Sequence, residues 1–193
     1  GGAWKGLVKT YYIPSSDGTA VYVGDVVKFN GESGAAGLTI NGMDMEGIPQ
    51  VIRVAAGNVT TGVAGVVVGF YPNMDSLMTK HRAASTNRAV MVCPVEDVIF
   101  EIQEDAVTTP VAAASVNLNA SFTTTAGNAT TGVSAMALDS DSVGTTGTLP
   151  LRVLGLSKRV GNAFNTAGAG SDPATFDVMF TASHQLGQIP NGL

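Results

Sequence analysis

The sequence predicts an all-β protein, either a β-barrel or a β-sandwich, with long loops rich in Gly, Thr and Ser. Residues 21–29, Val-Tyr-Val-Gly-Asp-Val-Val-Lys-Phe, are β-branched and aromatic around one Gly-Asp pair, as in two strands joined by a tight turn or bulge. Residues 63–71 form a continuous apolar run that is closed by Pro72, and we expect the two stretches to pair. Because a run that is apolar on both faces must be covered on both faces, the pair requires a barrel or sandwich core.

The composition favours a protein that functions as part of a larger assembly. Hydrophobic residues make up 45% of the 193, which is ample for a core, whereas charged residues make up only 13%. The net charge is −5 and Lys and Arg form no block, so we expect no nucleic-acid groove. The apolar runs are shorter than the roughly 20 residues of a membrane helix, and no charged leader opens the chain, so we expect a soluble protein.

The remaining strands are expected wherever apolar, β-branched runs resume between turn residues. Glycine-rich residues 30–47 and the least β-like stretch, residues 72–88, are expected to be loops. Residues 1–14 are either an arm or a first strand, and residues 15–193 are one domain with a possible subdivision near residue 106. An octapeptide at 56–63 recurs almost unchanged at 126–133, which marks either two related β units or one turn chemistry used twice. Strands are predicted at 47–54, 89–95, 98–103, 116–122, 134–138, 149–160 and 175–182.

The N-terminal segment has two interpretations. It carries the only Trp and two of the four Tyr of the chain, together with two of its ten cationic residues. It can be a first strand of the core, or it can be an arm that docks on a partner, since Trp and Tyr are common at recognition surfaces. Under the second hypothesis the binding residues are Trp4, Lys5, Leu7, Lys9 and Tyr11.

The loop at 72–88 is a second candidate contact surface. Its Met and Leu side chains form an adaptable apolar group, and Lys80, His81, Arg82 and Arg88 surround them with positive charge. The alternative is a solvated loop whose Met residues fold back on the barrel. The contact hypothesis names Met74, Leu77, Met78, Lys80 and Arg82.

The sequence contains no recognised catalytic or metal-binding motif, so we expect no enzyme, no cofactor and no metal. The single Cys93 is expected to be a buried hydrophobe. Ser183 and His184 are neighbours, which on a strand places their side chains on opposite faces. The carboxylates lack the spacing of a cation-binding loop and are expected to form a solvated face. They are Glu101, Glu104, Asp105, Asp139 and Asp141.

The order of several segments resembles the head decoration, or cement, proteins of tailed bacteriophages. The segments include Tyr-Tyr-Ile-Pro at 11–14, Gly-Ile-Pro-Gln-Val at 47–51 and Val-Ile-Phe-Glu-Ile-Gln-Glu-Asp at 98–105. The resemblance spans most of residues 11–105 and continues more weakly at 118–119 and 149–156. It implies a homotrimer on the outer surface of an icosahedral head that clamps neighbouring major capsid subunits together.

Two other classes of function remain as alternatives. A β-module of a virion fibre or adhesin that binds carbohydrate or a host surface would expose aromatic side chains in a groove. Aromatic residues are only 6% of this chain and concentrate near its N-terminus. A hydrolase of unfamiliar type would use Cys93 or a serine, and labelling with an activity-based probe would detect it.

Overall fold

The computed structural model describes residues 6–55, 62–74, 76–105, 109–165 and 173–185, and the all-β prediction is confirmed. Within these ranges the chain forms strands joined by loops and two short 3-10 turns, η1 (Ala113–Ser115) and η2 (Ala182–His184). Among the described residues, no helix has the length and apolar character needed to cross a membrane. The strands are β1 (Lys9–Ile13), β2 (Val26–Ser33), β3 (Thr39–Ile40), β4 (Met43–Asp44), β5 (Pro49–Arg53), β6 (Val63–Phe70), β7 (Arg88–Cys93), β8 (Phe100–Gln103), β9 (Asn119–Phe122), β10 (Leu138–Gly144), β11 (Leu151–Leu156) and β12 (Thr175–Phe180).

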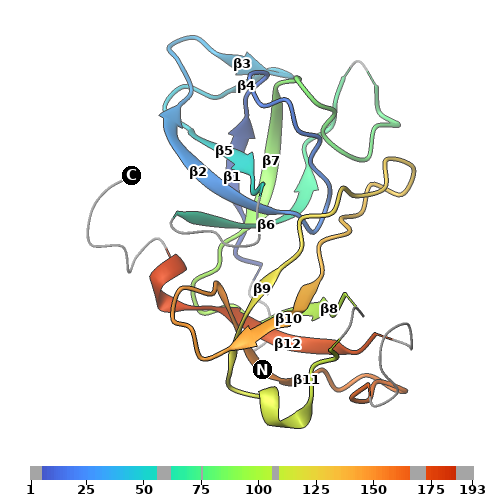
Figure 1. Cartoon of the computed structure of the whole chain (residues 1–193). Helices are drawn as coiled ribbons and strands as arrows, with labels where there is room; N and C mark the ends of the chain where they lie inside the picture. Colours follow the sequence, from blue (N-terminus) through green and yellow to red (C-terminus); the bar gives the residue numbers. More distant parts are fainter. Residues whose placement is uncertain (1–5, 56–61, 75, 106–108, 166–172, 186–193) are drawn as a thin grey trace.

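The first half folds into a closed barrel with the strand order β1-β5-β2-β6-β7 (Figure 1). The predicted pairing of the two apolar runs is confirmed, because β2 and β6 are antiparallel neighbours with Val26 opposite Val66. Glycine permits the close packing of β6 on β7: a Cβ atom at Gly65 would lie 2.1 Å from the carbonyl oxygen of Cys93. The inner faces of all five strands supply the barrel core, which includes Tyr11, Val27, Val51, Val67 and Val90.

The stretch before β2 is a turn and not the first arm of a hairpin. Val21 and Val23 make only isolated bridges, to Arg82 and Val133. Gly24 then adopts φ +98°, a conformation that glycine accepts readily, and directs the chain into β2. The two stretches on either side of Gly24 therefore bond to different parts of the molecule.

The glycine-rich region at 30–47 is more ordered than expected. β2 continues to Ser33 and pairs there with Pro49 of β5, and β3 and β4 form a small hairpin. Ile40 and Met45 from this region are buried against Tyr12 and Ala89 on the outside of the barrel. The prediction of an exposed loop was wrong because burial of these two side chains outweighs the local effect of the glycines.

The second half forms a five-stranded sheet with the order β10-β9-β11-β12-β8. Since β8 already belongs to it, the change of sheet falls between β7 and β8, ahead of residue 106. The strand predicted at 134–138 is displaced, because β10 runs from Leu138 to Gly144 through a stretch that was expected to be a spacer. β10 is an edge strand with the polar sequence Asp-Ser-Asp-Ser, so apolar periodicity could not reveal it.

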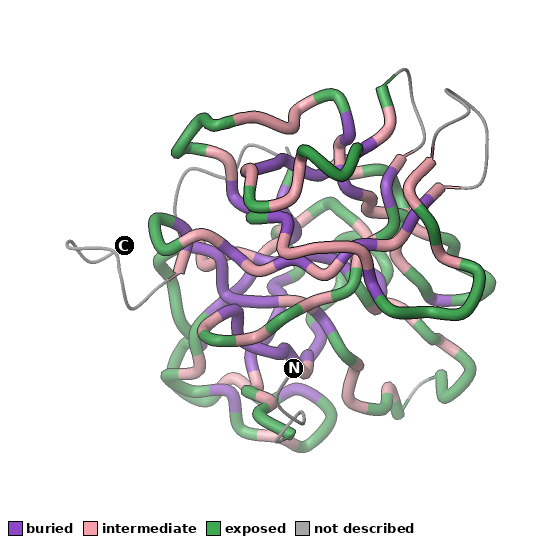
Figure 2. Tube along the Cα trace, turned by 90° about the horizontal axis from the view of Figure 1, so that it is seen from below, coloured by how far each residue is buried: buried purple, intermediate pink, exposed green. Residues whose placement is uncertain are grey.

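A shared core joins the barrel to the second sheet. Figure 2 shows most of the buried segments toward the middle of the molecule and the exposed ones mainly in the outer loops. The second sheet supplies most of this core, including Phe122, Leu151 and Phe176. The barrel half contributes Val26, Val54, Val63 and Val95 to the same cluster.

Residues 123–137, here named the crossing segment, leave the second sheet after β9 and return to the barrel before entering β10 (Figure 1). The Val23 amide donates to the Gly132 carbonyl at 2.9 Å, and the Ser134 amide donates to the Val23 carbonyl at 2.8 Å. The second copy of the repeated octapeptide lies in this segment. Residues 56–61 of the first copy lie outside the described residues, so the hypothesis of two related β units stays a prediction.

Candidate protein-interaction surface

Residues 72–81, here named the tip loop, present the most exposed group of large apolar side chains on the described chain. Met74, Leu77 and Met78 are 74%, 78% and 85% exposed. The loop contains local turns, with the Ser76 amide donating to the Asn73 carbonyl at 3.1 Å and the Thr79 amide donating to the Ser76 carbonyl at 3.3 Å. The alternative in which the Met side chains fold back on the barrel is therefore wrong for Met74 and Met78.

Arg82 fixes the C-terminal end of the tip loop from within the protein. The expectation that it lies at the surface was wrong, because its side chain is fully buried. Its guanidinium bridges turns from distant parts of the sequence, and its nearest carboxylate oxygen is Asp17 Oδ2, at 3.8 Å from Nη1. Burial lowers the pKa of Arg82, and Asp17 acts in the opposite direction. The accepting carbonyl oxygens belong to Thr86 (2.8 Å from Nε), Thr19 (2.5 Å from Nη1), Pro14 (2.6 Å from Nη2) and Asp17 (2.8 Å from Nη2).

A second buried arginine fixes the N-terminal end. Arg88 Nε donates to the Tyr71 carbonyl at 3.0 Å, and the guanidinium lies 5.9 Å from the ring centre of Phe70. Burial lowers the pKa of Arg88. Asn41 Nδ2 donates to the Pro72 carbonyl at 2.8 Å and ties the β3–β4 hairpin to the same place. The tip loop is thus anchored at both ends, by hydrogen bonds to the Tyr71 and Pro72 carbonyls before it and by the side-chain hydrogen bonds of Arg82 after it.

The crossing segment supports the base of the tip loop. The ring of His81 stacks on Tyr22 with centroids 5.0 Å apart and an interplanar angle of 16°. Gly132 has φ +77°, and a Cβ atom there would lie 2.8 Å from the Lys80 carbonyl oxygen. Lys80 itself is exposed, as the contact hypothesis expects. Because the base is packed this closely, the exposed tip is presented in a fixed place.

The candidate residues of the N-terminal segment are separated by the structure. Trp4 and Lys5 lie outside the described residues. Leu7 is 54% exposed, and Lys9, at the start of β1, is exposed as well. Tyr11 points into the barrel, where its ring meets Phe29 edge to face at 5.3 Å, and burial, with a smaller effect of Glu96, raises the pKa of Tyr11.

The assignment of Tyr11 to a binding surface was therefore wrong. β1 lies between β5 and β7 in the closed barrel, so residues 9–13 are a first strand and not an arm. Only the residues ahead of Lys9 remain available for the arm hypothesis.

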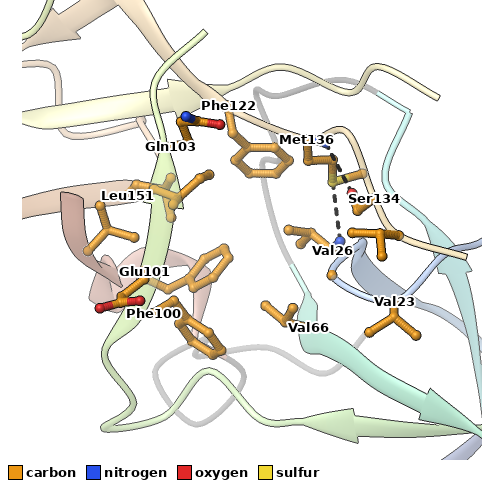
Figure 3. A pocket seen from close by; sticks show the side chains of 15 residues that line it. Val23, Val26, Val66, Phe100, Glu101, Gln103, Phe122, Ser134, Met136 and Leu151 are labelled. Atoms are coloured by element: carbon orange, nitrogen blue, oxygen red, sulfur yellow. Dashed lines mark hydrogen bonds between the residues drawn. The ribbon is translucent and has the colours of Figure 1, made fainter. Parts of the chain in front are cut away.

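A groove lies between the barrel and the second sheet, and sequence reasoning missed it (Figure 3). Its cavity has a volume of about 220 Å³. Phe100, Phe122 and Leu151 project into it from the second sheet, facing Val26 and Val66 from the barrel (Figure 3). No local pattern could have revealed it, because its two walls come from strands far apart in sequence. Exposed Val133, Glu101 and Gln103 lie at its edge.

A buried ion pair of the barrel half lies next to the groove and binds the crossing segment through hydrogen bonds. Arg53 Nε donates to Asp25 Oδ2 at 2.8 Å, and the Ser134 hydroxyl donates to Asp25 Oδ1 at 2.5 Å. Arg53 Nη2 also donates to the carbonyls of Thr124 and Thr125, at 3.0 and 2.7 Å. The polar atoms at this side of the groove are therefore already engaged with one another.

The residues weighed for catalysis do not form a known arrangement. Cys93 is buried, as predicted. Ser183 and His184 lie in η2 rather than on a strand, so the opposite-face geometry of a strand does not apply, and the Ser183 hydroxyl lies 3.0 Å from His184 Nδ1. The Thr181 hydroxyl lies 2.8 Å from the same nitrogen, so the contact belongs to one local turn. His184 is buried.

The carboxylates of the second half mostly bond to nearby protein groups. Glu104 was expected on a solvated face but is buried, where it accepts the amides of Val111 (2.9 Å) and Ala174 (3.0 Å). The Glu101 carboxylate accepts hydrogen bonds from Arg159 and Ser157, which lower the pKa of Glu101. Among the described residues, no three His, Cys, Asp or Glu side chains gather closely enough to hold a metal ion. Asp105 accepts the Ser140 hydroxyl at 2.9 Å, and Asp141 accepts the Thr109 amide at 3.1 Å.

Comparison of the chain with protein-family models, with curated proteins and with solved structures finds no match.

Proposed function

We propose that this chain is a structural virion protein without enzymatic activity. It decorates the outer surface of a bacteriophage head as a homotrimer and clamps neighbouring subunits of the major capsid protein. The observation that carries the proposal is the tip loop, an exposed apolar element on a base fixed by Arg82 and Arg88. The resemblance of segment order to phage decoration proteins supplies the choice of partner.

The physical argument concerns the cost of leaving this surface in water. Burying a side chain such as Leu77 or Met78 against a partner contributes about 1.5–3 kcal/mol. Because the base of the loop is already ordered, little conformational entropy is lost on binding. Exposed Met residues also adapt to irregular partner surfaces. These properties favour a protein partner for the tip loop, in keeping with a chain of low charge that functions inside an assembly.

The carbohydrate-binding alternative finds less support. Sugar-binding grooves present aromatic faces, whereas the large apolar side chains exposed on the described residues are all aliphatic or Met. They are Leu7, Val68, Met74, Leu77, Met78, Ile99, Val133 and Val160.

Binding to phage heads tests the proposal directly. Heads of the phage that encodes the chain, stripped of it, are mixed with purified protein and pelleted. We expect the wild-type protein to pellet with the heads, and the double variant Leu77→Glu, Met78→Glu to bind at least about tenfold more weakly. Val160→Glu is the matched control, because Val160 is fully exposed and lies outside the tip loop.

Two results would count against the proposal. The first is a wild-type protein that stays in the supernatant with these heads at micromolar concentration. The second is its absence from mass spectra of intact virions, where a decoration protein is expected at a copy number comparable with that of the major capsid protein. A separate variant, Leu7→Glu with Lys9→Glu, tests whether the residues at the start of β1 also contact the head.

A further inference from the structure

Two apolar surfaces on the described part of the chain are open to solvent, and they have opposite shapes. The tip loop projects outward with Met74, Leu77 and Met78. The groove between the barrel and the second sheet is a hollow (Figure 3). Val133, one of its lining residues, is 53% exposed. Exposed apolar side chains that gather as they do in the tip loop mark an interaction site more often than scattered ones.

The size and chemistry of the groove match a long apolar side chain. A dry cavity of roughly 150 Å³ holds a benzene-sized group, so the 220 Å³ of this cavity accept one Met side chain and part of a neighbouring Leu. The Ser134 hydroxyl is committed to Asp25, and Met136 Sδ accepts the Val26 amide at 3.3 Å. Since these polar atoms are engaged, the occupant gains by being apolar.

The tip loop does not fill the groove of its own chain. Its base is fixed by Arg82 and Arg88, and Leu77 and Met78 are 78% and 85% exposed. A contact between these two surfaces therefore has to join different copies. Where the second copy does not return the contact, the interface is heterologous and produces a ring when the rotation between copies closes, whereas a contact returned about a two-fold axis gives a closed dimer.

We propose that the tip loop of one copy docks into the groove of a second copy, with Met78 and Leu77 as the inserted side chains. The chain then associates head to tail. The number of copies in the ring, three, rests on the proposed function. The contact between copies is inferred from the tip loop and the groove alone. In the closed trimer the tip loop lies between copies, so the double variant Leu77→Glu, Met78→Glu weakens head binding through loss of the trimer, and the exposed residues at and just before the start of β1 are then the candidates for the capsid contact.

Two variants each remove one half of the contact. The tip variant is Leu77→Glu with Met78→Glu, and the groove variant is Val133→Glu, which places a carboxylate at the edge of the cavity. All substituted side chains are more than half exposed, and thermal unfolding checks that both variants fold. We expect the wild-type protein and the Val160→Glu control to associate, and each variant alone to associate at least about tenfold more weakly in analytical ultracentrifugation.

An equimolar mixture of the two variants is the decisive sample. The tip variant keeps an intact groove and the groove variant keeps an intact tip loop, so one contact can form between them. We expect a 1:1 heterodimer and no larger species. A mixture that stays monomeric, or single variants that associate like the wild type, would overturn the proposal, as would a wild-type protein that is monomeric at all concentrations.

Methyl NMR of labelled Met provides a second readout that does not depend on the variants. Met78 reports on the tip loop, Met136 on the groove, and buried Met45 on the outside of the barrel. We expect the Met78 and Met136 signals to shift together as concentration rises, while the Met45 signal stays in place. Shifts confined to other methyl groups would place the self-contact elsewhere. No heads are present in these samples, so the result is independent of whether the chain decorates them.

Discussion

Replacing Arg82 with Met should remove much of the stability of the protein. The side chain is fully buried and donates to four backbone carbonyls, two of which belong to Pro14 and Thr86. Met has a similar length and no donor, so all four carbonyls lose a hydrogen bond without leaving a large cavity, although those of Pro14 and Asp17 each keep one backbone amide. Three of the turns that meet at this point, around residues 14, 17 and 19, precede the arginine in sequence by more than 60 positions.

The expected magnitude follows from the number of acceptors. Each acceptor that loses its hydrogen bond to Arg82 costs about 1 kcal/mol net, because two of the carbonyls keep a backbone amide and opened turns readmit water to the others. Four acceptors then give about 4 kcal/mol, a large part of the 5–15 kcal/mol that stabilises a typical domain. With an m-value of about 2 kcal/mol per molar urea, the midpoint of unfolding should fall by about 2 M.

Urea unfolding followed by circular dichroism measures this loss. Arg82→Lys should lie between the wild type and Arg82→Met, because one ammonium group reaches fewer carbonyls than a planar guanidinium. Arg152→Met is the control, since Arg152 is exposed and its bond to Asn119 is long, at 3.4 Å. A loss below about 1 kcal/mol for Arg82→Met would refute the reasoning, because the carbonyls would then be satisfied without the arginine.

Three further predictions concern other parts of the fold. Asp25→Ala leaves the buried Arg53 guanidinium without its carboxylate, so the free energy of unfolding should fall by about 3–5 kcal/mol. A loss under about 1 kcal/mol in urea unfolding would contradict this. Burial, and then Asp105, raises the pKa of Asp139, so the folded state binds its proton more tightly than the unfolded state and stability declines as pH rises through that range. Asp139→Asn should therefore melt at a higher temperature than the wild type at pH 7, with the difference closing below about pH 3.9, and equal melting temperatures at pH 7 would argue against it. Gly132→Ala, at φ +77° in close contact, should destabilise by about 1 kcal/mol or more, whereas Gly147→Ala meets nothing within 4 Å and should be neutral in the same melting assay.

The apolar strands of the fold could be predicted from the sequence because burial on both faces leaves a local signature. β6 is a continuous apolar run, β11 is apolar except for exposed Arg152, and both were expected where they occur. β10 was misplaced because an edge strand needs only one hydrogen-bonded neighbour and can be polar along its length. Its position is set by pairing with β9, and no local sequence pattern encodes that pairing.

The candidate site was predictable only in part, for a similar reason. The exposed Met and Leu side chains of the tip loop matched one of two interpretations, a contact surface ringed by positive charge, while the other had the Met residues folded back on the barrel. The role of Arg82 was not anticipated, because a cation in a loop normally remains in water. Its burial depends on carbonyls supplied by turns at residues 14–19 and 86, whose convergence is a property of the closed barrel.

The crossing segment has a consequence for the order in which the chain folds during synthesis. The hydrogen bond between Asp25 and Ser134 joins residues 109 positions apart, and that between Arg53 and Thr125 joins residues 72 positions apart. Neither bond can form before the later residue has been synthesised. At roughly 5–20 residues per second, the ribosome needs about 2–8 s to advance from the end of β7 at Cys93 to Ser134. The barrel strands are present throughout that interval, while the Asp25–Arg53 pair lacks the carbonyls until residue 125 and the hydroxyl until residue 134. The nascent barrel is therefore expected to remain loosely packed on the ribosome until the second half arrives, and to be most vulnerable to proteases and to aggregation in that interval.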